Sequence, residues 1–166
     1  MKWLGDEWRG FQRVLTRCFP RRIQRPARSS PAELRVLALV PEGQNRRVLQ
    51  AAVQEAGWKL SIADSAAAWR APHADVPPIV IFDRELSPHE WGESIRLFAN
   101  RTPKPYIILL SPSSDTNLWD ELYRAGGSEI VRTPIDPGHL LWAVLIAWQL
   151  WRTQQFVRSP LPTVTR

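Results

Sequence analysis

Hydrophobic and polar positions follow two different patterns along the chain from residue 34 onward. Short apolar runs, which are typical of buried strands, alternate with segments whose apolar residues recur three and four positions apart, which is typical of amphipathic helices. The apolar runs predict strands over 34–40, 58–63, 77–82, 106–110 and 128–132. The other segments predict helices over 45–57, 65–69, 89–100, 116–127 and 137–152.

This alternation predicts the fold class. Strands that alternate with helices form parallel βαβ units with right-handed crossovers, and strands covered on both faces are apolar throughout. We therefore expect an α/β domain with a doubly wound, five-stranded parallel sheet. Sites in such sheets form at the carboxyl ends of strands, and Asp83 directly follows the apolar residues "IVIF". Because burying an unpaired charge is costly, Asp83 is the first candidate functional residue.

A different pattern precedes this domain. Apolar residues at positions 4, 8, 11, 15 and 18 share one face of a helix, and arginines lie on another face. A stretch rich in Pro, Arg and Ser follows, which is typical of a linker. We expect residues 1–32 to form a basic amphipathic helix and a linker, residues 33–153 the α/β domain, and residues 154–166 a C-terminal tail.

Charge separates the same two regions. The whole chain has a net charge of +6, and residues 1–32 hold eight Lys or Arg against two acidic residues, so 8 − 2 = +6 lies there and the rest is neutral. Three interpretations of this segment stay open. It is a solvated helix face, or a helix over residues 1–19 that lies on an anionic membrane surface. Nucleic-acid binding is the weakest of the three, because no helix-turn-helix pattern accompanies it.

Composition and motifs exclude several protein classes. The single cysteine, Cys18, cannot form an intrachain disulfide, which favours a reducing compartment. The longest apolar run has nine residues, Leu140–Trp148, and a membrane span needs ~20. We expect a cytoplasmic protein, at most peripheral to the inner face of the membrane. Nucleotide-binding loops, nucleophile elbows and histidine metal spacings are absent from the sequence, so we do not expect an enzyme.

The last predicted helix, over 137–152, is apolar on two sides. One stripe, which we expect to pack on the sheet, consists of Leu141, Val144, Leu145 and Trp148. The second stripe consists of Trp142, Ile146 and Leu150. Because a helix that is apolar all round must be covered all round, we expect the second stripe to be an interface. Its partner would be another protein, a second copy of the chain, or the chain's own Trp8, Phe11 and Leu15.

Three segments occur in a characteristic order: "IVIFDRELSP", "IILLSP" and "AGGSEIVRTP". In this order they resemble the receiver domain of two-component response regulators, over about Leu34 to Arg152. The resemblance implies the chemotaxis-type, flavodoxin-like (βα)5 fold and a role in phosphorelay signalling with a histidine kinase. It also implies that Asp83 is at the phosphoacceptor position and that Ser111 is at the switch position ending the fourth strand.

The chain departs from this family at the residues that carry the chemistry. In receivers an acidic pair at the end of the first strand holds Mg²⁺ with the acceptor aspartate, a lysine precedes the last proline, and an aromatic switch residue lies in the fifth strand. The corresponding positions here are occupied by Val40 and Pro41, Thr133, and Ile130. Glu42 comes one place too late to replace the pair, so Asp83 and Glu42 make at most a weak metal site.

Phosphoryl transfer to a carboxylate relies on positioning and charge neutralisation. In receivers the acidic pair and the lysine supply these, and both are missing from this chain. We therefore expect a degenerate, stand-alone receiver, or pseudo-receiver. It would act by protein–protein interaction, without a cofactor and without efficient phosphorylation. Two alternatives stay open: an ordinary response regulator phosphorylated on Asp83, and an adaptor attached to membrane or nucleic acid by its basic helix. Asp83 is also open to a purely structural interpretation, as a cap of the next loop that takes a further hydrogen bond from Ser111.

Overall fold

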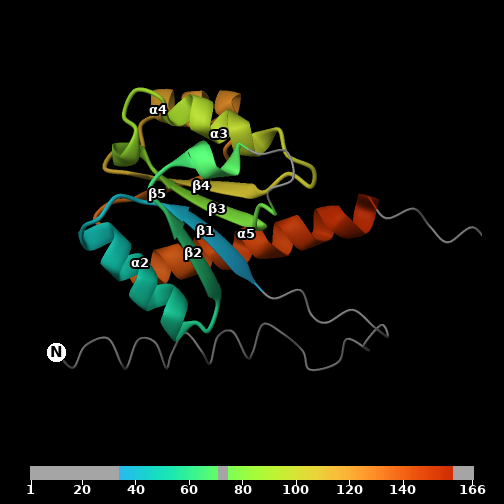
Figure 1. Ribbon diagram of the computed structural model, residues 1–166, viewed down its shortest axis with the longest axis horizontal. Coiled ribbons are helices and arrows are strands. Elements are labelled where there is room, and N and C mark those ends of the chain that lie inside the picture. The colour runs from blue at the N-terminus through green and yellow to red at the C-terminus, as the bar shows by residue number, and fades with distance from the viewer. Residues whose placement is uncertain (1–33, 71–74, 159–166) are drawn as a thin grey trace, which may run out of the picture. The chain divides into compact units, whose positions relative to one another are not determined.

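Five parallel strands form one sheet in the order β2-β1-β3-β4-β5 (Figure 1). The computed structural model describes residues 34–70 and 75–158, so the helix expected within 1–32 lies outside the described residues. The strands are β1 (Arg35–Leu39), β2 (Lys59–Ala63), β3 (Ile79–Asp83), β4 (Tyr106–Ser111) and β5 (Glu129–Arg132). The predicted doubly wound parallel sheet is confirmed.

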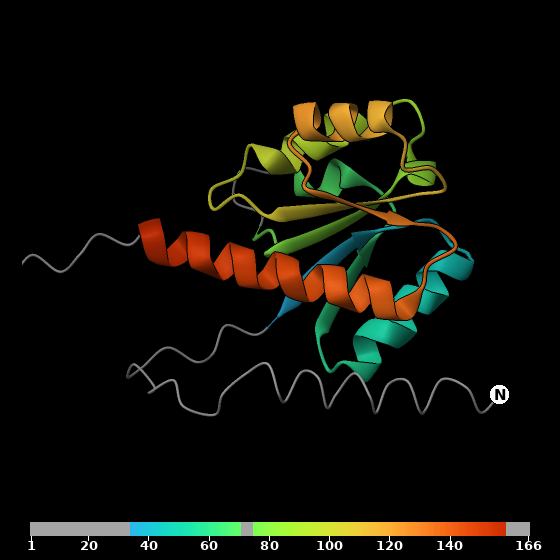
Figure 2. The ribbon, with the colours of Figure 1, turned by 180° about the vertical axis from the view of Figure 1, so that it is seen from behind.

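Helices cover both faces of this sheet. The α-helices are α2 (Gln44–Glu55), α3 (Trp91–Ala99), α4 (Thr116–Ala125) and α5 (Pro137–Arg158). Two 3₁₀ helices are η1 (Ala66–Trp69) and η2 (Arg84–Leu86). Figures 1 and 2 show α2 and α5 on one face and α3 with α4 on the other. The segment expected as a short helix over 65–69 is η1, so four α-helices rather than five accompany the strands within the described residues.

The core lies between the sheet and the helices on each face. Every residue of β3 is buried, as expected for a central strand covered on both sides. On one face, α3 packs Trp91, Ile95 and Phe98 at helical spacing against Phe82 and Leu109 of the sheet. Fully burying an apolar side chain of this size stabilises the fold by roughly 1.5–3 kcal/mol.

The ends of α4 follow local sequence signals. The side chain of Asp115 accepts a hydrogen bond from the backbone N–H of Leu118 at 3.0 Å and so caps the helix start. Gly126 ends the helix in the left-handed conformation, at φ +95°. Both boundaries agree with the predicted helix.

The last helix, α5, has one buried and one exposed apolar side. The residues that are at most 8% exposed are Leu140, Leu141, Ala143, Val144, Ala147 and Trp148. The second stripe is open: Trp142 is 50% exposed, Ile146 40% and Leu150 44%. Leu145, which was expected against the sheet, is only half-buried because it lies between these two sides.

The same helix is longer than the sheet that it covers. It has 22 residues, or about 33 Å at 1.5 Å per residue, and it continues past residue 153 to Arg158. Figures 1 and 2 show its last turns beyond the strands. In this part Trp148 stacks on Trp151 with ring centroids 5.5 Å apart. Within the described residues, no helix has the length and hydropathy to cross a membrane.

Candidate functional site

The carboxyl ends of the strands meet at one edge of the sheet, and this carboxyl edge carries the polar residues of the candidate site. The last residue of β1 is aligned with the last residue of β2 and with Phe82 of β3. Val40, Asp64 and Asp83 therefore come to the same edge. Ser111 ends β4 one position beyond the partner of Asp83.

Asp83 is fully buried, and both of its carboxylate oxygens are hydrogen-bonded. The backbone N–H of Glu85 donates to Oδ1 at 2.9 Å, and the side-chain amide of Asn45 donates to Oδ2 at 3.2 Å. The first bond makes Asp83 the cap of η2. The two donors compensate for the loss of hydration on burial. The predicted strand-end carboxylate is thus held by two N–H donors.

Ser111 is also fully buried, at the end of the neighbouring strand. Its hydroxyl oxygen accepts a hydrogen bond from the backbone N–H of Ser113 at 3.3 Å. Among the described residues, the side-chain donor to Asp83 is Asn45 and not Ser111, contrary to the expected bond. Ser111 therefore closes the turn after β4.

Thr133 and Ile130, at the lysine and aromatic switch positions of the receiver family, both make structural contacts. Thr133 is half-buried, its backbone N–H donates to the carbonyl of Ser111 at 2.9 Å, and its peptide bond to Pro134 is cis. Ile130 is 4% exposed and belongs to the core under α3 and α4. Thr133 brings no positive charge to the edge, and Ile130 is a packed core residue.

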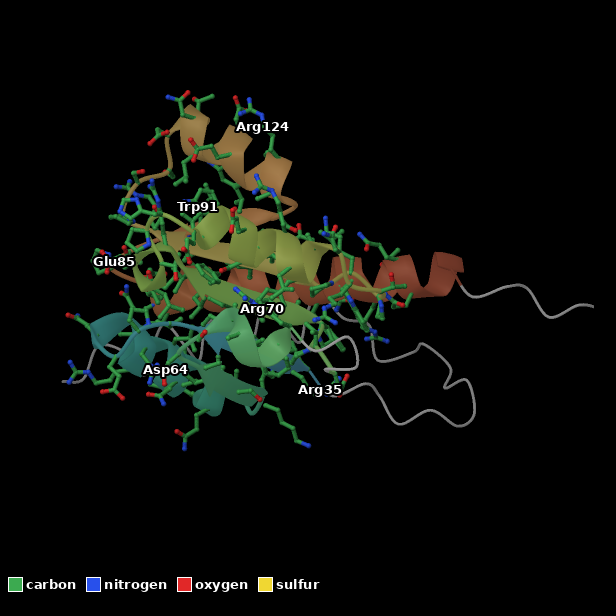
Figure 3. All side chains as sticks on the ribbon, turned by 45° about the horizontal axis from the view of Figure 1, so that its top comes forward. Arg35, Asp64, Arg70, Glu85, Trp91 and Arg124 are labelled. Carbon is green, nitrogen blue, oxygen red and sulfur yellow. The ribbon has the colours of Figure 1, made fainter. Side chains whose placement is uncertain are left out.

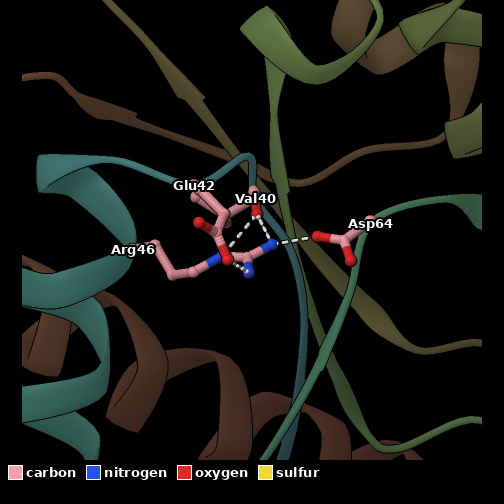
Figure 4. Close-up of polar contacts among 4 residues, drawn as sticks. All are labelled: Val40, Glu42, Arg46 and Asp64. Carbon is pink, nitrogen blue, oxygen red and sulfur yellow. Dashed lines mark hydrogen bonds and ion pairs between the residues drawn. The ribbon is translucent and has the colours of Figure 1, made fainter.

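A second polar network surrounds the end of β1 (Figure 4). The guanidinium of Arg46, on α2, donates to the carbonyl of Val40 from Nε at 2.9 Å and from Nη2 at 2.6 Å. It also forms ion pairs with Glu42, at 3.4 Å from Nη1, and with Asp64 through Nη2. The Arg46 side chain is only 14% exposed, whereas those of Glu42 and Asp64 are 91% and 79% exposed. We call these four residues the Arg46 network.

The Mg²⁺ ion that the receiver resemblance implies can be tested against this donor set. Mg²⁺ takes carboxylate oxygens and water in near-octahedral geometry. At the expected place Val40 is buried and apolar, Glu42 pairs with Arg46, and Asp83 accepts two N–H bonds. Across the described residues no three His, Cys, Asp or Glu side chains are grouped so that they could hold a metal. With the guanidinium of Arg46 paired to Glu42 and Asp64, the residues present do not fit the ion.

Sequence reasoning missed Asn45, Arg46 and Asp64. Asp64 directly follows the strand over 58–63, just as Asp83 follows its own strand, so the strand-end rule applied to every strand would have found it. Asn45 and Arg46 lie in the first turn of α2. Their reach to the carboxyl edge depends on how that helix packs, which the local sequence does not encode.

A groove lies between α3 and α4, with a volume of ≈ 350 Å³. Figure 3 labels two of its lining residues, Trp91 and Arg124. Its charged side chains are exposed and of both signs: Glu93, Arg96, Glu121 and Arg124. None of these four charged groups is buried, so they do not form a buried charged site for a ligand.

No protein-family model and no curated protein matches this sequence. Solved structures do match. The chemotaxis response regulator CheY4 of Vibrio cholerae has 18% sequence identity and a TM-score of 0.61, over 70% of this chain and 99% of that one. The signal receiver domain of an HD domain-containing protein from Pseudomonas fluorescens Pf-5 has 18% identity and a TM-score of 0.67, over 78% and 96%.

A CheY-like response regulator receiver domain protein from Methanospirillum hungatei JF-1 is also similar, with 16% identity and a TM-score of 0.61 over 74% of this chain and 99% of that one. These structures share the sheet-and-helix arrangement described above, at sequence identities that show the fold alone. The described part of the chain therefore has the response regulator receiver fold.

Proposed function

We propose that this chain is a degenerate receiver of bacterial two-component-type signalling, which acts by binding another protein and accepts phosphoryl groups poorly. The observation that carries the proposal is the state of Asp83. It lies at the strand end where receivers have their phosphoacceptor, yet it is fully buried and both oxygens accept N–H bonds, from Glu85 and Asn45. The position of Asp83 supports descent from a signalling receiver. Its two hydrogen bonds support a structural role.

Poor acceptance of phosphoryl groups follows from the charges around this carboxylate. The transferred group carries negative charge that must be neutralised by fixed cations or a metal ion. Thr133 contributes no charge, and the guanidinium of Arg46 is already engaged by Val40, Glu42 and Asp64. Losing one such contact to the transition state typically costs a few kcal/mol, about 10²–10³ in rate, so losing two makes acceptance slow.

The exposed stripe of α5 supports a binding function. Trp142, Ile146 and Leu150 repeat every four residues and are 50%, 40% and 44% exposed. Neighbouring large apolar groups at this spacing form one strip along the helix, and tryptophan is enriched at energetically dominant interface positions. We propose that a partner protein or a second copy covers this strip.

We further propose a cytoplasmic location, with residues 1–19 as a contact to anionic membrane lipid.

Phosphorylation is tested by incubating the full chain with Mg²⁺ and acetyl phosphate and measuring its intact mass. We expect no mass increase of one phosphoryl group beyond that of Asp83→Asn, which retains the size of the side chain. A receiver that is known to accept phosphate, treated in the same mixture, controls for the donor. An Asp83-dependent increase at a rate similar to that of the control would establish the alternative, an ordinary response regulator phosphorylated on Asp83.

A further inference from the structure

The Arg46 network joins one positive charge to oxygen atoms from the segments that follow two neighbouring strands. After β1, Val40 contributes its carbonyl oxygen and Glu42 a carboxylate oxygen. Asp64, directly after β2, contributes another carboxylate oxygen (Figure 4). Oxygen atoms of carboxylates and backbone carbonyls are also the ligands that divalent cations take in proteins. The guanidinium therefore occupies a point with the ligand chemistry of a cation site.

The position of this network is as informative as its chemistry. Val40 directly follows β1, where the receiver resemblance implies an acidic pair and a metal ion, and the residues here do not suit Mg²⁺ while Arg46 is present. Arg46 reaches this place from α2, with its side chain only 14% exposed. Its planar guanidinium has donors in several directions, so it can satisfy several oxygens at once.

We propose that Arg46 is the resident cation of the carboxyl edge and takes the place of the divalent ion. While Arg46 is present, the edge neither needs nor accepts such an ion. Once its guanidinium is removed, the oxygens of Val40, Glu42 and Asp64 form a weak site for Mg²⁺ or Ca²⁺. Arg46 holds the charged groups of the edge together in this way whether or not Asp83 accepts a phosphoryl group.

The contacts of Arg46 explain why its removal would lower the stability of the fold. Val40 itself is fully buried, and two nitrogen atoms of the guanidinium donate to its carbonyl oxygen. Without Arg46 this oxygen loses both donors, and Asp64 loses its counter-charge. Arg47, the next residue of α2, is exposed and takes no part in the network. Arg46→Met and Arg47→Met therefore remove the same charge from the same helix, but only Arg46→Met disrupts the Arg46 network.

The test is thermal unfolding of the full chain, followed by tryptophan fluorescence, in MgCl2 or CaCl2 up to about 10 mM, which exceeds the millimolar range of weak calcium sites. NaCl of matched ionic strength is the reference. We expect the Tm of the wild type and of Arg47→Met not to respond to divalent ions beyond this reference. We expect the Tm of Arg46→Met to be at least about 2 °C below that of the wild type. Ca²⁺ or Mg²⁺ should restore part of this difference.

A double variant, Arg46→Met with Asp64→Asn, removes one of the ligands and should abolish that recovery. If Arg46→Met does not fold in NaCl, its refolding yield with and without Ca²⁺ replaces the Tm. Three results would overturn the proposal: a wild-type Tm that rises with divalent ions, an Arg46→Met chain as stable as Arg47→Met, or an unstable Arg46→Met chain that no divalent ion stabilises.

Discussion

The side-chain amide of Asn45 donates a hydrogen bond to Oδ2 of Asp83 at 3.2 Å, across 38 residues of sequence. This contact joins the first turn of α2 to the end of β3. Asp83 is fully buried and Asn45 is half-buried, so the bond is largely shielded from water. It gives one oxygen of the buried carboxylate a neutral donor from a different element of the fold.

The first prediction concerns this bond. Asn45→Ala leaves one buried oxygen of Asp83 without its donor, and an orphaned buried acceptor typically costs about 1–3 kcal/mol of unfolding free energy. The measurement is urea unfolding at neutral pH. Asn117→Ala is the control, because Asn117 is also in the first turn of a helix but is exposed. Equal losses in the two variants would contradict the role given to Asn45.

The second prediction concerns pH and the start of α4. The backbone N–H of Leu118 and then the hydroxyl of Ser113 hold the pKa of Asp115 below 3.8. A carboxylate with a lowered pKa in the folded state stabilises the fold above its unfolded pKa and loses this effect as pH falls through its folded pKa. Asp115→Ala should therefore lower the Tm at pH 7, and the difference from the wild type should shrink below pH 3.8.

The control for this prediction is Asp120→Ala on the same helix. Asp120 lies 3.8 Å from Arg124 in an exposed i,i+4 pair and does not cap the helix. Such pairs contribute little, so this variant should melt close to the wild type. A Tm difference between Asp115→Ala and the wild type that stays constant from pH 7 to pH 3 would be evidence against the cap.

The third prediction concerns the end of α4. Gly126 has φ +95°, and a Cβ atom there would lie 2.5 Å from the Cβ of Ala99. Gly126→Ala should reduce the unfolding free energy by about 1–2 kcal/mol for the backbone conformation alone, and further for the clash. Gly92→Ala, within α3 and with open space around it, should instead raise it by up to about 1 kcal/mol. Urea unfolding of both variants tests the sign of each change.

The fourth prediction concerns the exposed stripe of α5. Trp142→Glu places a charge within this strip, so it should reduce self-association or binding to a partner while the Tm changes little. Light scattering after size exclusion, over a range of protein concentrations, measures the oligomeric state. Val144→Ala, on the buried side of the same helix, should have the opposite profile: lower stability and an unchanged oligomeric state. A wild type that is monomeric at every concentration would rule out the second copy as the partner.

Most of the fold could be predicted because its signals are local. The apolar runs marked all five strands, and the boundaries of α4 followed from Asp115 and Gly126. Prediction was less successful where a segment is short or lies between two environments. The residues after Asp64 form only a 3₁₀ helix, Ala66–Trp69, and Leu145 is at the border between the buried and exposed sides of α5.

The candidate site was only half predictable. Asp83 and Ser111 could be placed at the carboxyl edge because each ends an apolar strand. The partners that decide their chemistry could not be placed, since Asn45 and Arg46 reach the edge only through the packing of α2. In a sheet of this kind the strand ends are fixed by short-range sequence, and the helix that covers them determines which charges they meet.

The length and direction of α5 determine how the domain can be attached to anything else. The helix runs back from the carboxyl edge, and Figures 1 and 2 show its end on the same side of the domain as the start of β1. The start of β1 and the end of α5 therefore lie opposite the edge that holds Asp83 and Arg46. A tether to a surface, a fused reporter or a biosensor linker at either of these points would leave that edge facing outward and open to approach.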